Sequence, residues 1–151
     1  MAGKTVRVLE KTLFANLLDN VAANASVKTW VATNVDISGY LYGCLVLRVH
    51  SWPTATGAPT IALSAFGSAP TSEDPASTFR GPVVIDGQTN GKIAFSATVA
   101  PTITTVGVNF SSLGAGAGAP GFVDILLTVT QGATANSPTV FTVSGDLVLR
   151  S

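Results

Sequence analysis

The sequence predicts an all-β fold, a single antiparallel β-sandwich of jelly-roll type with eight or nine strands. Apolar and polar residues alternate at every second position, and clusters of Gly, Pro, Ser and Asn separate the alternating segments. Many short strands at such spacing are typical of sandwiches and closed barrels. A jelly roll needs eight strands in two sheets, which fits this count.

Four segments show the strongest alternation. They cover residues 27–37, 41–50, 122–130 and 139–149, and their apolar residues fall mainly on odd positions. Because the side chains of a strand point alternately to its two faces, the odd positions should form one buried face. The residues that we expect to be buried are Val31, Leu45, Leu47, Ile125, Leu127, Phe141 and Leu147.

Further strands are predicted near residues 5–8, 61–65, 83–85, 92–99 and 106–110. The Asn90-Gly91 pair favours a hairpin between two of them, since both residues tolerate positive φ. Gly145 interrupts the last strand and indicates a bulge or a close backbone contact. Only 13–21 has helical spacing, at Leu13, Leu17 and Val21.

The length of 151 residues suits one domain over 1–151, with residues 1–12 as an N-terminal arm or edge strand. Charged residues make up only 11%, and eight basic residues balance eight acidic ones. This differs from the basic footprint of a nucleic-acid binder. Net charge also normally keeps a free monomer in solution. We therefore expect no nucleic-acid partner, and either a surface that neighbours cover or a protein that works outside the cell.

The N-terminal residues do not form a signal peptide, and the apolar runs are too short to span a bilayer. These observations predict synthesis in a host cytoplasm and no membrane partner. Cys44 is the single cysteine, so the chain has no internal disulfide. A neutral composition with few charged residues, combined with cytosolic synthesis, is typical of virion proteins.

No motif indicates catalysis. His50 is the only histidine, and Cys44 lies about 20 Å away on the same predicted strand, too far for a catalytic pair. We expect His50 to be a plain strand residue and Cys44 to fill the core. Glu73-Asp74 suits either a Ca²⁺ loop or a polar turn closed by Pro75, and the turn is favoured. The sequence predicts no enzyme, no cofactor and no required metal.

Three segments are candidates for assembly contacts. The N-terminal segment carries mixed charge and suits docking onto a neighbour, although an edge strand blunted by charge is the alternative. Trp52-Pro53 would supply a rigid aromatic anchor, and the uncharged loop 113–121 has few side chains to desolvate. The candidate contact residues are Lys4, Val6, Arg7, Trp52, Pro53, Leu113, Gly116, Gly118 and Pro120.

The profile resembles the small β-sandwich or jelly-roll structural proteins of bacteriophage virions, both capsid and decoration proteins. The resemblance lies in one β domain rich in Thr, Ala, Gly and Ser, without an export signal or a catalytic cluster. It implies a homo-oligomer located in the virion. Its partners would be copies of itself and a major capsid or other virion protein, joined by β-augmentation or arm exchange.

A carbohydrate-binding sandwich, lectin-like or for host attachment, is the alternative function. Trp30 and Trp52 would then belong to a sugar-stacking platform, with Tyr42 and His50 as further members of one face. Partial burial of both tryptophans at a sheet edge or a subunit interface is the simpler interpretation. An enzyme, the third class, would need a pocket with convergent polar groups.

Overall fold

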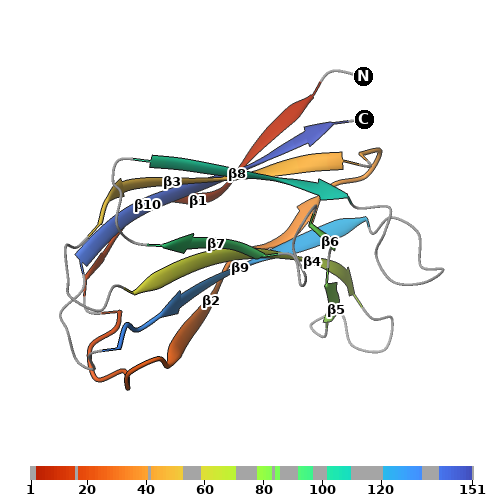
Figure 1. The fold of residues 1–151 in the computed structure, drawn as a ribbon. Helices are drawn as coiled ribbons and strands as arrows, with labels where there is room; N and C mark the ends of the chain where they lie inside the picture. The colour runs from red at the N-terminus through yellow and green to blue at the C-terminus, as the bar shows by residue number, and fades with distance from the viewer. Residues whose placement is uncertain are drawn as a thin grey trace.

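A computed structural model gives the fold (Figure 1) and describes residues 3–15, 17–40, 42–52, 59–70, 78–82, 84–85, 92–96, 102–109, 121–133 and 140–150. These residues form ten strands and no helix. The strands are β1 (Lys4–Ala15), β2 (Ser26–Asp36), β3 (Tyr42–Ser51), β4 (Thr60–Pro70), β5 (Thr78–Pro82), β6 (Val84–Ile85), β7 (Lys92–Ser96), β8 (Thr102–Asn109), β9 (Phe122–Thr130) and β10 (Val140–Arg150). The described part of the chain contains no helix long and apolar enough to cross a membrane.

The strands form two antiparallel sheets that face each other (Figure 1). The first sheet has the order β1-β10-β3-β8-β6. The second has the order β2-β9-β4-β5, and β7 pairs with β4 beside β5. Apart from the short β5 and β6, successive strands alternate between the sheets except for β4 and β7, which both belong to the second sheet, giving β1-β10-β3-β8 opposite β2-β9-β4-β7. Eight strands connected in this way form a jelly roll, so the predicted fold class is confirmed.

The four strongest predicted strands correspond to β2, β3, β9 and β10, each within one residue at either end. Six of the seven residues expected to be buried are buried in the core between the sheets. Val31 is the exception and is half-buried, because β2 is the edge strand of its sheet. The odd-numbered apolar face therefore predicts the core except at this edge.

The predicted helix over 13–21 is wrong. Leu13 to Ala15 continue β1, and a turn follows at 17–20. The reason is strand alternation: Phe14 points inward and stacks on Phe141, with ring centroids 5.1 Å apart, while Leu13 points outward. Three apolar residues spaced four apart therefore span a strand and the turn after it.

The predicted hairpin around Asn90-Gly91 is also not formed by the strands on either side of it. β6 pairs with β8 in the first sheet, whereas β7 pairs with β4 in the second. The turn residues themselves lie outside the described residues. A local turn signal thus does not determine which strands pair.

Gly145 forms the close contact that its position predicts. A Cβ atom there would lie 3.3 Å from Leu63 Cδ1 on the opposite sheet and 3.4 Å from Leu9 Cβ on the neighbouring strand. The register of β1 against β10 shifts on either side of the Leu9–Gly145 pair. The missing side chain lets Leu63 approach β10 at the point where β1 is irregular.

Candidate functional site

The N-terminal segment is the edge strand of its own sheet. β1 pairs with β10 from Lys4–Leu149 to Ala15–Val140 and contributes the buried side chains of Val8 and Leu9 to the core. In the described part of the chain, no other strand pairs with β1, so one backbone edge of β1 is open. Of the predicted contact residues here, Lys4 and Arg7 are exposed and Val6 is half-buried.

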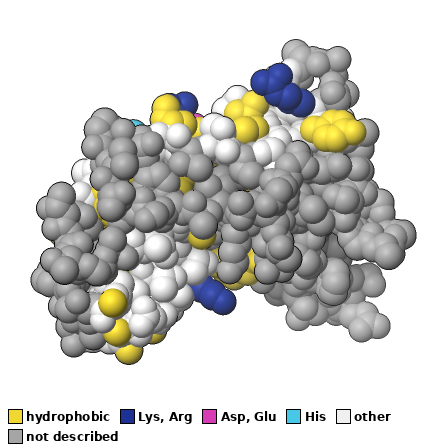
Figure 2. All heavy atoms as spheres, in the orientation of Figure 1, with side chains coloured by type: hydrophobic (Ala, Val, Ile, Leu, Met, Phe, Trp, Pro, Cys, Tyr) yellow, Lys and Arg dark blue, Asp and Glu magenta, His cyan; other side chains and the backbone are white. Residues whose placement is uncertain are grey.

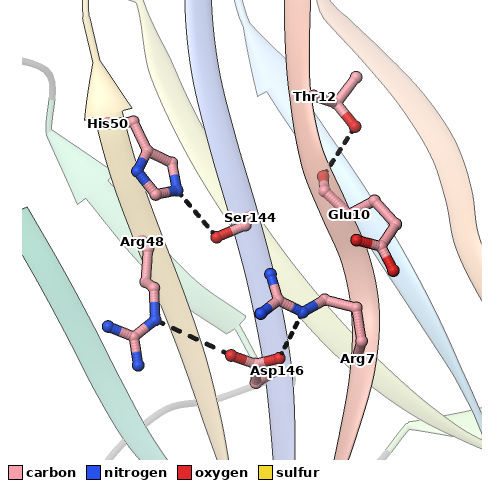
Figure 3. A network of polar contacts seen from close by, with 7 residues as sticks. All are labelled: Arg7, Glu10, Thr12, Arg48, His50, Ser144 and Asp146. Carbon is pink, nitrogen blue, oxygen red and sulfur yellow. Dashed lines mark hydrogen bonds and ion pairs between the residues drawn. The ribbon is translucent and has the colours of Figure 1, made fainter.

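Two arginines meet over β10 at one aspartate (Figure 3). Arg7 Nε lies 2.8 Å from Asp146 Oδ1, and Arg48 Nε lies 3.8 Å from Asp146 Oδ2. The Asp146 side chain is only 10% exposed, whereas those of Arg7 and Arg48 are 42% and 44% exposed. A desolvated carboxylate needs paired charge, and the two guanidinium groups supply it while staying in contact with water. The three residues together carry one net positive charge.

His50 bonds to Ser144 beside this cluster, with His50 Nε2 and Ser144 Oγ 2.9 Å apart (Figure 3). A serine nucleophile must be accessible to its substrate and needs a base oriented by a third group. Ser144 is buried, and the nearby Asp146 pairs with arginines. The pair therefore fits a structural hydrogen bond between β3 and β10 better than catalysis.

Cys44 does not fill the core as expected. It is half-buried on the outward side of β3, and its Sγ contacts the carbonyl oxygen of Leu45 at 3.6 Å. Among the described residues, no group of three His, Cys, Asp or Glu side chains could hold a metal ion. Glu73-Asp74 lies outside those residues.

The outer face of the first sheet exposes large apolar side chains. Leu13, Tyr42, Ile103 and Val140, one from each of β1, β3, β8 and β10, are 49% to 63% exposed. Figure 2 shows hydrophobic side chains beside Lys and Arg along the upper edge of the molecule, over this sheet. Apolar and cationic groups thus share one open surface.

Two rings cover part of the outer face of the second sheet, over β9. Trp30 on β2 and Phe66 on β4 meet edge to face across β9, with ring centroids 5.4 Å apart. Beneath them Leu126 and Asp124 point outward yet are buried. Asp124 Oδ1 accepts the Asn34 N–H at 2.7 Å, where a register shift in β2 gives Asn34 a φ of 51°.

The two tryptophans do not form a shared platform. Trp52 is half-buried and packs against Phe141 in the core, with ring centroids 5.2 Å apart, whereas Trp30 lies on the outside of the other sheet. Tyr42 and His50 are near opposite ends of β3. The four residues therefore do not share one face, and the alternative of a sugar-stacking platform is not supported. Pro53, Leu113, Gly116, Gly118 and Pro120 lie outside the described residues.

The sequence did not indicate the buried aspartates. Asp124 and Asp146 are both buried inside strands. Their partners, Asn34 for one and Arg7 and Arg48 for the other, are distant in the sequence. The one sequence feature that could have indicated this burial is a charged residue within an otherwise apolar strand.

Comparison with solved structures finds a similar fold in chains from two virus structures. No family model matches the chain, and no curated protein matches its sequence. A chain from the structure of infectious bursal disease virus, Gx strain, superposes with a TM-score of 0.52 at 13% identity, covering 98% of this chain and 31% of that one. A chain of the Triatoma virus empty capsid gives a TM-score of 0.51 at 8% identity, covering 98% of this chain and 88% of that one.

These likenesses establish a shared jelly-roll fold. This chain spans about a third of the length of the bursal disease virus chain and most of the Triatoma virus chain. A carbohydrate-binding module specific for non-crystalline cellulose superposes less well, with a TM-score of 0.43 at 8% identity, covering 97% of this chain and 73% of that one. That value is too low to support a functional comparison.

Proposed function

We propose that the chain is a structural protein of a virus particle, either a capsid subunit or a subunit that decorates and stabilises a capsid. The observation that carries the proposal is the jelly-roll topology, which superposes over 98% of the chain on chains from two viruses. The Thr-, Ala-, Gly- and Ser-rich composition favours a bacteriophage as the source. In this proposal the protein acts by assembly and has no catalytic role.

Surface chemistry supports the proposal independently, because one fold can serve many functions. Only 11% of residues are charged, and the net charge is zero. Large apolar side chains stand exposed on the first sheet, and β1 has an open backbone edge among the described strands. Surfaces and edges of this kind are normally covered by another protein.

The partners in this proposal are copies of the chain and a second virion protein. Lys4 and Arg7 on β1, and Leu113, Gly116, Gly118 and Pro120 in the uncharged loop, remain the proposed contacts. Trp52 is less suited to a contact, because its ring packs against Phe141 in the core. Arm exchange would remove Val8 and Leu9 from the core, so addition of a strand at the open edge of β1 is the favoured mode.

Electron microscopy and the mass in solution of the full chain test this function. We expect discrete oligomers or particles from the unchanged chain. Gly116→Asp with Gly118→Asp should abolish them while circular dichroism still reports a folded β protein. Ala23→Asp, at an exposed position between β1 and β2, is the matched control and should assemble normally.

Two results would count against the proposal. A full-length chain that stays monomeric at high concentration would leave carbohydrate binding as the leading function, to be tested on soluble glycans. Normal assembly of the Gly116→Asp, Gly118→Asp variant would remove the loop from the contacts. Deleting residues 2–11 would test little, because the deletion also removes Val8 and Leu9 from the core.

A further inference from the structure

We infer that the outer face of the first sheet docks onto an acidic, partly apolar surface of a different protein. The face is formed by β1, β10, β3 and β8 and is marked by Arg7, Arg48, Leu13, Tyr42 and Ile103. The inference rests on the proposed function only in taking the partner to be another virion protein. The binding chemistry follows from the residues of the face itself.

The face has the composition of a protein contact. Leu13, Tyr42, Ile103 and Val140 are four of the five large apolar side chains that are exposed among the described residues. Their strands flank the arginine pair at Asp146. Aromatic and aliphatic side chains interleaved with arginine are enriched at the cores of protein interfaces and at their energetic hot spots.

The charge of the face is one-sided. Asp146 is the only acidic residue on β10, β3 and β8, and its two carboxylate oxygens already face Arg7 and Arg48. Glu10 on β1 turns its carboxylate away from β10 (Figure 3). Arg150 adds another exposed arginine opposite Tyr42. An approaching surface therefore meets guanidinium groups, which bind carboxylates in a fixed geometry.

The face is large enough for a specific contact. Four strands spaced about 4.8 Å apart, each about ten residues long, cover roughly 600 Å². A standard protein interface buries about 800 Å² on each partner. A contact over the face and its rim therefore reaches the size of a specific complex.

Charge argues against a second copy as the occupant. A two-fold interface through this face would oppose identical patches and place arginine against arginine, with the one central carboxylate already paired. Nucleic acid fits less well than protein, because phosphate tracking needs many more basic groups than this sheet offers and gains little from Leu13 and Ile103. A protein surface with unpaired carboxylates and apolar groups would pair with the arginines and pack against the apolar side chains of the face.

Synthetic polymers test the inference on the full-length chain. The probes are a random copolymer of glutamate and tyrosine, poly-L-glutamate and single-stranded oligodeoxythymidine, each titrated while backbone amide shifts are followed by NMR. We expect the copolymer to bind most tightly and to shift amides of β1, β3, β8 and β10. Arg7→Gln, Arg48→Gln and Tyr42→Ser should each weaken copolymer binding about tenfold.

The controls separate binding from folding. Lys28→Gln removes an exposed charge from β2 on the other sheet and should leave copolymer binding unchanged. Each arginine variant keeps one guanidinium beside Asp146, and Tyr42→Ser leaves the ion pairs intact. Thermal unfolding confirms that every variant is folded.

Three outcomes would overturn the inference. They are amide shifts confined to the second sheet, tighter binding of oligodeoxythymidine than of the copolymer, and self-association through this face that Tyr42→Ser abolishes. Failure of the proposed function is a separate result, since a chain that never assembles could still bind the copolymer through this face.

Discussion

The two sheets differ in the side chains that lie over a buried aspartate on their outer faces. Each sheet has an inner strand, β10 or β9, with an outward-pointing aspartate that is buried. In each, side chains from the flanking strands meet over that strand. Over β9 they are the rings of Trp30 and Phe66, and over β10 they are the guanidinium groups of Arg7 and Arg48.

The difference determines which face is left for a partner. Aromatic rings bury apolar area, and Leu126 on β9 is buried. Among the described residues, Trp30, at 39%, is the one large apolar side chain that is exposed on the outer face of the second sheet. Guanidinium groups keep their charge in water, and the large apolar side chains Leu13, Tyr42, Ile103 and Val140 of this sheet stay exposed. The outer face of the first sheet is therefore open.

Phe66→Ala should give the largest loss of stability. It removes half of the ring pair that covers β9, and we expect about 2–4 kcal/mol less free energy of unfolding in urea. Leu13→Ala on the open face is the matched change and should cost less than about 0.5 kcal/mol. Equal costs would mean that the two faces are equally closed.

Asp124→Ala comes next. It removes the acceptor for the Asn34 N–H at an irregular point of β2 and truncates a side chain that is fully buried. We expect a loss of about 1–3 kcal/mol in the free energy of unfolding. Faster amide hydrogen exchange at Asn34 should accompany it, and unchanged exchange there would contradict this role.

Asp146→Ala should cost less than Asp124→Ala, at about 1 kcal/mol. Its partners Arg7 and Arg48 are more than two-fifths exposed, so water can solvate them once the carboxylate is gone. The cost should shrink in concentrated NaCl, because salt screens exposed charges. A loss of free energy of unfolding that is larger than for Asp124→Ala, or that does not change with salt, would contradict this prediction. It would mean that the ion pairs stabilise the first sheet as much as the aromatic pair stabilises the second.

Asp36 supplies the smallest effect, as an exposed carboxylate outside both faces. Hydrogen bonds from the Ser38 side chain and the Ser38 backbone N–H lower the pKa of Asp36. A lowered pKa in the folded state stabilises the fold above the ordinary pKa, and this contribution is lost as the pH falls through the folded value. Ser38→Ala should raise the pKa of Asp36 in a carboxyl NMR titration, and no change would contradict the side-chain bond.

Alternation in the sequence predicted β2, β3, β9 and β10 because their odd-numbered apolar residues face the core, where they are buried in β3, β9 and β10 and half-buried in the edge strand β2. Pairing was harder to predict, since a jelly roll joins strands that are distant in the sequence, whereas the Asn90-Gly91 signal is local. The same limit applies to the site. Arg7 and Asp146 lie near opposite ends of the chain and meet only through the register of β1 on β10.

Trp52 illustrates a second limit of the sequence. Its neighbour Pro53 favours a rigid surface loop, but nothing local says that the ring turns inward onto Phe141. Trp30, in contrast, falls on the same even-numbered face of β2 as Lys28, and both side chains are exposed. Sequence thus predicts the face of a residue inside a strand better than its direction at a strand end.

Native mass spectrometry of the full-length chain at rising concentration tests most directly whether the protein acts by assembly. The account predicts discrete homo-oligomers at physiological salt. A single monomer mass at every concentration would contradict it.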